Sequence, residues 1–431
     1  MKRYLFSLLL LSSAAAAQAQ QPGTAAATVI AVPPLTSPDS GTRGNQMLAV
    51  GWDVTQLIAS DLQQTAEVMP LKPNRDDYYS YPEVTAPTFS KWRAAGAKAL
   101  VMGFVQSRSD GRLTVGCYVY DLDKGRELAR KGFVIGPSDW RRAAHKCSGL
   151  AYTAITGAPG MFDTRIAYVA ESGVGDARTR RIAVMDSDGY NHKYLTPGTA
   201  MVLTPRLAPN GGQLAYVSFA DGEPKVRILD IGSGHERPLV PTGAISFAPR
   251  YSPDGSRIVF SMMLGSNSDI YVVGANGGLP QRLTTSPGVD TDPSFSPDGS
   301  KIVFESDRGG SQQLYVMNAD GSGERRISFG GAWYAAPEWS PDGNWIAFTR
   351  RAQDGRRIGI LKPDGTGETV LTTGPGDEGP SWAASSREII FQRADGAGRS
   401  HLYRVALDGS AARRMATPQD GSDPDWSGVM D

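Results

Sequence analysis

The chain has 431 residues, of which 40% are hydrophobic and 20% charged, and it contains 50 Gly and 29 Pro. This composition is typical of a globular protein rich in turns, and the length predicts more than one domain. Lys plus Arg and Asp plus Glu both number 44, so there is no excess positive charge to concentrate nucleic acid or anionic lipid, which excludes both as main partners.

The first element in chain order is a signal peptide over residues 1–19. Lys2-Arg3 precedes the apolar run Tyr4–Leu11, which is too short to cross a bilayer, and Ala17-Gln18-Ala19 supplies a small-residue cleavage site. No cysteine follows the run to carry a lipid. The pattern predicts export, cleavage near Gln20, and a mature chain that does not span a membrane.

Residues 20–157 lack the repeat found further on, and their mixed periodicities predict an α/β domain. The expected strands are residues 28–35, 99–106, 112–121 and 126–135, and the expected helices are residues 45–67, 88–95 and 138–156. In the first helix Leu48, Trp52, Ile58 and Leu62 are expected to face the core, and Gly157 is a plausible cap of the last helix. Ala158-Pro159-Gly160 is the expected hinge to the next domain.

This domain contains both cysteines of the chain, Cys117 and Cys147. Each lies on an apolar face, of a strand and of a helix respectively, so both are expected to point inward. An oxidising compartment permits a disulfide between them, but two small core residues are an equally simple interpretation. The sequence leaves the two alternatives open.

Residues 161–431 contain a repeat that begins with a proline. The prolines are Pro205, Pro249, Pro293, Pro337, Pro380 and Pro424. Their spacings are 44, 44, 44, 43 and 44 residues, and a bulky apolar residue follows two positions after each proline. A period of this length with short alternating segments predicts one four-stranded propeller blade per repeat.

Within one unit, a short strand opened by proline is followed by a Pro-Asp-Gly turn and three further strands. The first unit lacks its opening strand, and Asp423–Ser427 supplies it from the other end of the chain. We therefore expect an α+β N-terminal domain followed by an all-β six-bladed β-propeller, closed by pairing of the C-terminal strand with the first blade.

The sequence offers little that indicates catalysis or a cofactor. It has no Gly-x-Ser-x-Gly motif, and none of its four histidines has a partner at metal-ligand spacing. Acidic runs such as Asp186–Gly189 fall at hairpin positions, and turn residues are the better interpretation there. We expect no catalytic residues, no cofactor and no metal site.

A propeller without a catalytic or metal site can still function through its surface, by binding a partner. The loops that precede each proline and the loops between second and third strands share one face of the disc, and these loops vary. Phe247, Trp333 and Tyr334 are expected to be exposed on this face as anchors for a protein partner. Glu378 lies in another of these loops. Asp307-Arg308 lies in a loop of the same face, where a salt bridge within the loop is the alternative interpretation.

Several phrases resemble the TolB family of Tol-Pal proteins over nearly all of the mature chain. They are AVPPL (31–35), IASDL (58–62), GMFDTRIAYV (160–169), LAYVSFADG (214–222), DTDPSFSPDGSKIVFESDRGG (290–310) and APEWSPDG (336–343). The resemblance implies a periplasmic adaptor without catalysis that maintains outer-membrane integrity and supports cell division. Its implied partners are the lipoprotein Pal, the inner-membrane protein TolA and other envelope proteins.

In this resemblance, the positions that bind Pal match Ile245, Ala248, Thr291 and Asp292, on the varied face. TolA is bound by the N-terminal region, where this chain differs from the family because residues 20–28 are short and polar. An exported propeller enzyme, or a binder of small ligands in the central channel, is the alternative function, and it requires convergent acid, base or metal groups there.

Overall fold

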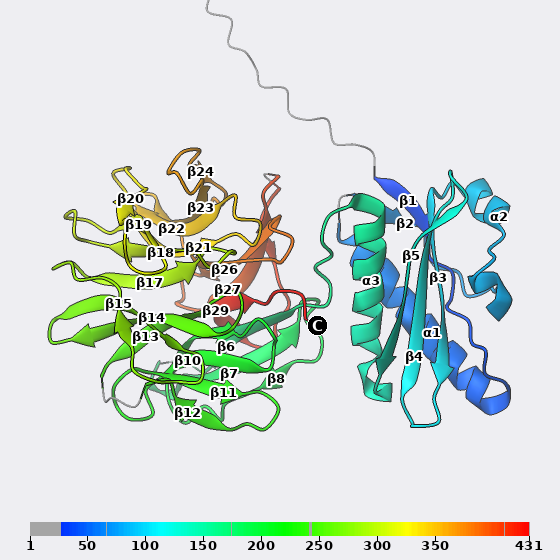
Figure 1. Ribbon diagram of the computed structural model, residues 1–431, viewed down its shortest axis with the longest axis horizontal. Coiled ribbons are helices and arrows are strands. Elements are labelled where there is room, and N and C mark those ends of the chain that lie inside the picture. The colour runs from blue at the N-terminus through cyan, green and yellow to red at the C-terminus, as the bar shows by residue number, and fades with distance from the viewer. Residues whose placement is uncertain (1–26, 66, 174, 241–243, 409, 431) are drawn as a thin grey trace, which may run out of the picture.

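In the computed structural model, an α/β unit and a β-propeller lie side by side (Figure 1). The structure describes residues 27–430 apart from 66, 174, 241–243 and 409. The predicted signal peptide and its cleavage site lie outside the described residues. None of the helices in the described part of the chain combines the length and the apolar character needed to cross a membrane.

The α/β unit is built on one sheet of five strands in the order β2-β1-β3-β4-β5. The strands are β1 (Thr28–Ala31), β2 (Val68–Pro70), β3 (Ala99–Ser107), β4 (Leu113–Asp121) and β5 (Arg126–Ile135). β1 runs parallel to β2 and β3, and the other pairs are antiparallel. The first strand ends at Ala31 and not at residue 35 as predicted, because Pro33 and Pro34 have no N–H to donate to a ladder. β2 is a strand that the sequence pattern did not predict.

Helices cover both faces of this sheet. They are α1 (Gly41–Gln63), α2 (Phe89–Ala94) and α3 (Trp140–Thr156), with the short 3₁₀ helices η1 (Tyr81–Val84) and η2 (Pro137–Asp139). α1 and α3 share one apolar cluster with the sheet, and α2 packs into a second cluster on the other face. Gly157 ends α3 in the left-handed conformation with φ 76°, as predicted.

The buried face of α1 differs from the expected one. The helix covers residues 41–63 and not 45–67, and Leu48 and Trp52 are only half-buried, whereas Ile58 and Leu62 are buried as predicted. The closest approach is at Gly51, where an added Cβ would lie 2.3 Å from the carbonyl oxygen of Leu35. Only glycine permits this contact, so the chain segment after β1 packs directly against the helix. The helix is therefore rotated relative to the predicted orientation, and a different set of its apolar residues faces the core.

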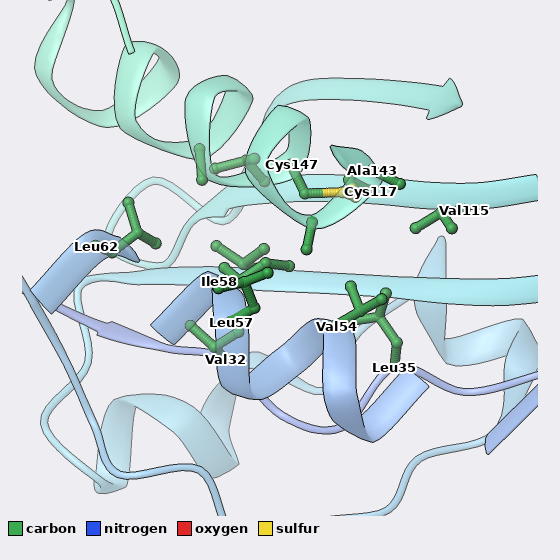
Figure 2. Packing of buried hydrophobic residues seen from close by; sticks show 14 of the residues in the cluster. Val32, Leu35, Val54, Leu57, Ile58, Leu62, Val115, Cys117, Ala143 and Cys147 are labelled. Atoms are coloured by element: carbon green, nitrogen blue, oxygen red, sulfur yellow. A yellow bond between two sulfur atoms is a disulfide. The ribbon is translucent and has the colours of Figure 1, made fainter. Parts of the chain in front are cut away.

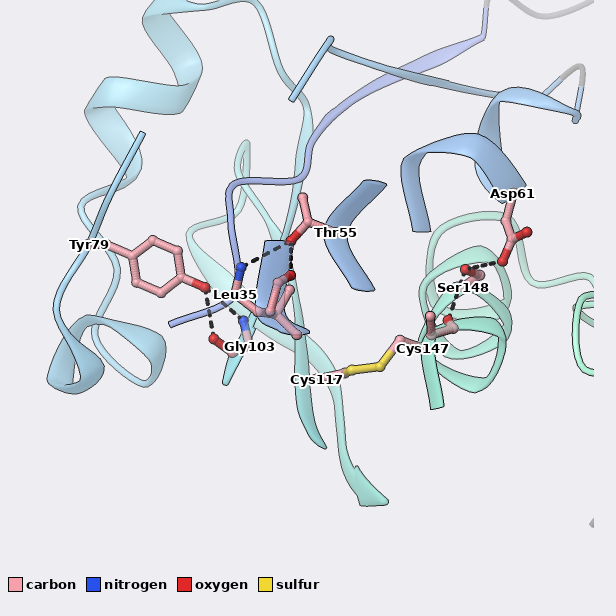
Figure 3. Close-up of a disulfide and its surroundings, with 10 residues drawn as sticks. Leu35, Thr55, Asp61, Tyr79, Gly103, Cys117, Cys147 and Ser148 are labelled. Carbon is pink, nitrogen blue, oxygen red and sulfur yellow. Dashed lines mark hydrogen bonds between the residues drawn. A yellow bond between two sulfur atoms is a disulfide. The ribbon is translucent and has the colours of Figure 1, made fainter. Parts of the chain in front are cut away.

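The two cysteines form a disulfide that joins α3 to β4, with 5.9 Å between the Cα atoms of Cys117 and Cys147. Figure 2 shows this bond inside the cluster that includes Ile58, Leu62 and Ala143. Buried hydrogen bonds support the same layer. The Thr55 hydroxyl accepts from the Leu35 N–H at 3.0 Å, and the Tyr79 hydroxyl donates to the Gly103 carbonyl at 2.8 Å (Figure 3). The disulfide alternative is therefore the one that the structure contains.

The propeller consists of six four-stranded sheets. The first two contain β6 (Arg165–Ser172), β7 (Thr179–Asp186) and β8 (Lys193–Tyr194), then β9 (Val202–Leu207), β10 (Gln213–Ser218), β11 (Lys225–Asp230) and β12 (Glu236–Pro238). The third and fourth contain β13 (Ser246–Tyr251), β14 (Arg257–Leu264), β15 (Asn267–Gly274) and β16 (Gln281–Arg282), then β17 (Asp290–Phe295), β18 (Lys301–Ser306), β19 (Gln313–Asn318) and β20 (Arg325–Arg326). The last two contain β21 (Trp333–Trp339), β22 (Ile346–Ala352), β23 (Gly355–Leu361) and β24 (Thr369–Val370), then β25 (Asp377–Trp382), β26 (Glu388–Ala394), β27 (Ser400–Ala406) and β28 (Arg413–Arg414). A short 3₁₀ helix, η3 (Gly175–Ala177), lies between β6 and β7.

The ring closes as predicted, because β29 (Asp420–Trp426) completes the first blade in the order β29-β6-β7-β8. Trp426 pairs with Ile166 in this ladder. The indole N–H of Trp426 donates to the Thr164 hydroxyl at 2.9 Å, and the Ser427 N–H donates to the Arg165 carbonyl at 2.8 Å. Strands from both ends of the repeat region thus share one sheet, which leaves no open edge at the seam.

The Pro-Asp-Gly motifs are tight turns, as predicted. In the turn after β13, the Asp254 carboxylate accepts hydrogen bonds from the Ser252 hydroxyl at 2.5 Å and from the Ser256 N–H at 3.0 Å. These bonds, the one from Ser252 first, lower the pKa of Asp254 to about 2. In the degraded sixth turn, Ser386 adopts the left-handed conformation that glycine adopts elsewhere, with φ 58°.

Replacement of Trp426 by alanine tests the closure. The side chain is 6% exposed, so Trp426→Ala is expected to lower the free energy of unfolding by about 3–5 kcal/mol through the lost contacts and the cavity. Urea unfolding followed by circular dichroism measures this loss. The control is Trp333→Ala, where the side chain is 54% exposed and a change within about 0.5 kcal/mol is expected. Equal losses in both variants would contradict a special role of the closing strand.

Candidate protein-interaction face of the propeller

The α/β unit covers one face of the propeller. The guanidinium of Arg141 on α3 pairs with Asp188 in the β7–β8 turn. The Arg387 guanidinium, in the turn before β26, donates to the Tyr152 hydroxyl at 2.9 Å. We call this end of the propeller, which carries the Pro-Asp-Gly turns and the turns between third and fourth strands, the turn face.

The opposite end we call the loop face. It carries the loops before the innermost strands, residues 195–201, 239–240 with 244–245, 283–289, 327–332, 371–376 and 415–419, and the loops between the second and third strands. Since the strands of each blade are antiparallel, these two loop types share one end of the propeller. The contacts described above leave this end to face away from the α/β unit.

The predicted site residues gather on the loop face. They lie at the starts of the innermost strands of four consecutive blades and in one loop between second and third strands: Ile245, Phe247 and Ala248 at β13, Thr291 and Asp292 on β17, Trp333 and Tyr334 on β21, Glu378 on β25, and Asp307 and Arg308 after β18. β13, β17, β21 and β25 are neighbours around the ring. The structure therefore brings together residues that are more than 130 positions apart in the sequence.

The expected exposure of the aromatic anchors is correct for one of the three. Trp333 is 54% exposed, but Tyr334 is 1% exposed. Because successive side chains of a strand point to opposite sides, the tyrosine turns inward, where its ring packs against Phe348 at 5.2 Å and its hydroxyl donates to Glu368. Phe247 is half-buried against a core cluster between blades. Both predictions of exposure were wrong.

Exposed apolar side chains that the sequence analysis did not single out extend this face. They are Met201, Leu264, Val289 and Phe329, and each lies in or next to a loop of the loop face. Phe329 is 71% exposed and lies four residues before Trp333. Large apolar side chains around the mouth of a channel are a feature of protein-binding surfaces.

The charged residues among the predicted site hold loops in place. Arg308 pairs with Asp290 at 2.7 Å and with Glu324, and the Asp307 carboxylate accepts the Val289 N–H at 2.8 Å. Arg308 is therefore bound in salt bridges, but these join its loop to β17 and to the segment before β20 and do not lie within the loop. Glu378 is held in the same way by two guanidinium groups, Arg351 at 3.2 Å and Arg356 at 3.0 Å.

A strained backbone position recurs at the channel wall. The residue before each repeat proline has positive φ: Thr204 45°, Ala248 50°, Asp292 51°, Ala336 49°, Gly379 62° and Asp423 49°. The ladder register shifts at the same place, for example between Thr291 and Ser294, so each innermost strand contains a bulge. A non-glycine residue in this conformation costs about 1–3 kcal/mol. Two of the predicted Pal-binding positions, Ala248 and Asp292, occupy these bulges.

The six residues that directly follow the repeat prolines are polar, and we call this set the polar column. The sequence analysis missed it. The column is Arg206, Arg250, Ser294, Glu338, Ser381 and Asp425. Its four acceptor side chains bind backbone N–H groups of the next blade: Glu338 accepts from Trp382 at 2.9 Å, Asp425 accepts from Leu207 at 2.7 Å, and the two serines accept in the same way. Each residue of the polar column stands one position after a repeat proline, and this constant spacing is the signal that could have revealed the column.

The two arginines of the column cannot accept hydrogen bonds and instead balance its carboxylates. Arg250 pairs with Glu338 at 2.6 Å and with Asp425 at 3.2 Å, two blades away in either direction. Arg206 lies 3.9 Å from the same Asp425. The ionic groups of this part of the channel wall are therefore bound to one another.

Two further carboxyl groups near the channel have raised pKa values. Burial raises the pKa of Asp292, against the lowering effect of Arg206 and Arg250. Burial, and then the charge of Asp292, raise the pKa of Glu305 well above its ordinary value. Glu305 nonetheless accepts the Ala336 N–H at 3.1 Å, next to one of the bulges. Burying these two carboxyl groups close together lowers the stability of the folded protein, and this loss is a consequence of the channel geometry.

Glu305→Gln tests that cost. A raised pKa in the folded state means that the contribution of this carboxyl to stability is complete below its unfolded pKa of about 4.5 and is lost as the pH rises through the folded value. The neutral amide avoids this loss, so the variant is expected to melt at a higher temperature than the parent at pH 8, and near the parent at pH 4. Calorimetry at both pH values measures the difference. Glu127→Gln, on the exposed part of β5, is the control and is expected to melt near the parent at both pH values. A Glu305→Gln variant that is less stable than the parent at pH 8 would contradict the argument.

Known protein families match both parts of this chain. Residues 152–430 match the family described as the TolB beta propeller domain, and residues 21–128 match the TolB amino-terminal domain. The crystal structure of TolB from Acinetobacter baumannii is similar with a TM-score of 0.75 and 27% identity, over 93% of this chain and 96% of that one.

Curated relatives match over part of their length. The chain is 50% identical over 206 residues to the Tol-Pal system protein TolB of Zymomonas mobilis, which is 48% of this chain and 45% of that protein. It is 49% identical over 193 residues to the protein of the same name from Rhizorhabdus wittichii, 44% of each chain. The chain thus spans about half the length of the curated relatives that it matches.

Proposed function

The chain belongs to the TolB family, and from this premise we propose that it is a periplasmic adaptor of the Tol-Pal envelope system. In this proposal the loop face binds the lipoprotein Pal and the N-terminal region binds TolA. The protein then links the two envelope layers, contributes to outer-membrane integrity and supports cell division. It acts through binding and not through catalysis.

The observation that carries the proposal is the position of the loop face. The α/β unit occupies the turn face through Arg141 and Arg387. The opposite end carries the exposed apolar residues and the strained positions Ala248 and Asp292. The exposed apolar side chains at this end support a binding role there, because a partner can bury them.

The charge distribution of the channel supports binding more than chemistry. Arg250, Glu338 and Asp425 are bound to one another, and the acceptor atoms of the column bind backbone N–H groups. These groups stabilise the ring between blades. A partner that docks on the loop face then meets charged groups that are already paired with one another, and exposed apolar side chains that it can bury.

Trp333 is the residue on which the Pal-binding proposal is tested most sharply. Trp333→Ala removes an exposed aromatic anchor and is expected to weaken binding of the soluble domain of Pal by about tenfold or more. Isothermal titration calorimetry with purified proteins measures the affinity. Thr291→Arg places a long charged side chain at an implied Pal-binding position and is expected to weaken binding as well.

Leu279→Ala is the matched control, because Leu279 is 90% exposed but lies in a turn of the turn face. Its affinity for Pal is expected to stay within about twofold of the parent value. Near-UV circular dichroism establishes that each variant is folded. Unchanged binding by both loop-face variants, or an equal loss in Leu279→Ala, would remove Pal from the loop face.

The TolA half of the proposal concerns residues 20–26, which lie outside the described residues. Their removal leaves β1 and the sheet intact. A pull-down from envelope extract with the shortened protein is expected to recover less TolA and the same amount of Pal. Equal recovery of TolA by the two proteins would assign TolA binding to another part of the chain.

A further inference from the structure

Helix α3 is the element that connects the two parts of the molecule. One side of it faces the sheet, where Cys147 is bonded to Cys117 of β4, and Figure 1 shows its other side toward the propeller. On that side, Arg141 pairs with Asp188 of the propeller, and the Lys146 ammonium donates to the Met430 carbonyl at 3.4 Å. This interface is polar, and polar interfaces between domains permit relative motion.

His145 lies at the centre of the interface, on α3, and is 2% exposed. Its Nδ1 atom lies 2.8 Å from the Asp61 carboxylate of α1. The same carboxylate accepts the Ser148 hydroxyl at 2.7 Å, as Figure 3 shows. Asp61 is itself 2% exposed, so the imidazole is held from the side of the α/β unit by a buried acceptor with a fixed position.

The other ring nitrogen faces the propeller. Nε2 of His145 lies 3.6 Å from Oδ2 of Asp188, in the turn between β7 and β8. It is buried and has no hydrogen-bond partner among the described residues. Asp188 is also bound by Arg141, whose guanidinium stacks on Tyr190 at 4.0 Å. One carboxylate of the propeller therefore receives a permanent cation and a titratable one from the same helix.

We propose that His145 is a proton-dependent clasp between the α/β unit and the propeller. When both ring nitrogens carry protons, Nδ1–H donates to Asp61 and Nε2–H is attracted to Asp188, so one imidazolium bridges the two parts. When the ring is neutral, Nδ1–H stays on Asp61 because that carboxylate can only accept. The lone pair of Nε2 then faces the Asp188 carboxylate, and the bridge to the propeller is lost.

Other charged groups near the ring come from every element packed around it. Asp139 lies at the end of η2, Arg142 on α3 itself and Asp163 in the linker, and the propeller contributes Arg165 from β6, Asp186 from β7 and Lys193 from β8. Together with Asp61, Asp188 and Arg141 they form a nearly balanced set. Ligand atoms of Asp61, His145 and Asp188 lie within 4.8 Å of one another, but Arg141 already pairs with Asp188, and a further cation would meet this guanidinium group.

The direction of the pH dependence follows from these contacts. Burial lowers the pKa of His145, but the hydrogen bond to Asp61 and the charges of Asp61, Asp188 and Asp186 outweigh burial and raise it overall. A histidine whose folded pKa is raised contributes stability that is complete below its ordinary pKa of about 6.5 and is lost as the pH rises through the folded value. The clasp is thus closed below the ordinary pKa of histidine and opens as the pH rises through the raised pKa of His145.

The experiment measures the ring and the domain geometry together. Histidine-selective nuclear magnetic resonance of the mature protein follows the protonation of His145 from pH 5.5 to 9. Pulsed electron paramagnetic resonance between spin labels on Arg126→Cys and Leu279→Cys measures the distance between the two parts over the same range. Both positions are exposed, and the native cysteines are in a disulfide. The distance distribution is expected to change with a midpoint above pH 6.5 that coincides with the titration of His145.

Variants separate the clasp from general effects of pH. His145→Gln keeps a hydrogen bond to Asp61 without titrating, and its distances are expected to be the same at all pH values. Asp188→Asn removes the repulsion at high pH and is expected to reduce the change. Arg141→Gln removes the permanent cation from Asp188, so that the pairing with α3 depends on His145, and it is expected to enlarge the change.

His235→Gln, in an exposed turn of the propeller, removes a histidine elsewhere and is expected to behave as the parent. Distances in the parent that do not change between pH 5.5 and 9 would overturn the proposal. A pH profile that persists in His145→Gln would overturn it equally, because the titrating group would then be another one. Neither result depends on Pal or TolA, so the test is independent of the proposed function.

Discussion

The pairing of β29 with β6 is the constraint on which the rest of the structure depends. A propeller blade has a short fourth strand, which here is two residues long in most blades, so a blade gains most of its stability from its neighbours. An open ring would leave the first and last blades each without one neighbour. With Trp426 beside Ile166, every innermost strand has a neighbouring innermost strand on each side around the ring, and only then do the loops of the loop face surround a channel.

The repeated proline connects this closure to the site. Each proline follows a bulge, and in four of the six blades the residue after it binds the backbone of the next blade, as Glu338 binds the N–H of Trp382. The same short segment thus fixes the strand, joins it to its neighbour and places a strained residue at the channel mouth. Where the column carries Arg250 in place of an acceptor, the link between adjacent blades is replaced by ion pairs across the channel.

Much of this could be predicted from the sequence because it follows from local periodicity. The spacing of the prolines gives the blades, and Asp423–Ser427 gives the closure. Contacts between blades or domains could not be predicted in the same way. Tyr334 turns inward because of the strand register, and Asp61, His145 and Asp188 meet only after α3 has docked on the propeller. The sequence could not decide whether the two cysteines form a disulfide, because an inward orientation alone does not bring two sulfur atoms together.

The late position of β29 also has a consequence for biogenesis. During vectorial emergence of the polypeptide, whether from the ribosome or from a translocation pore, β6 appears early and keeps an unpaired edge until almost the last residues have followed. Such an edge is a template for aggregation. Pairing of β29 with β6 covers this edge, so annealing of the seam is the step that completes the native topology.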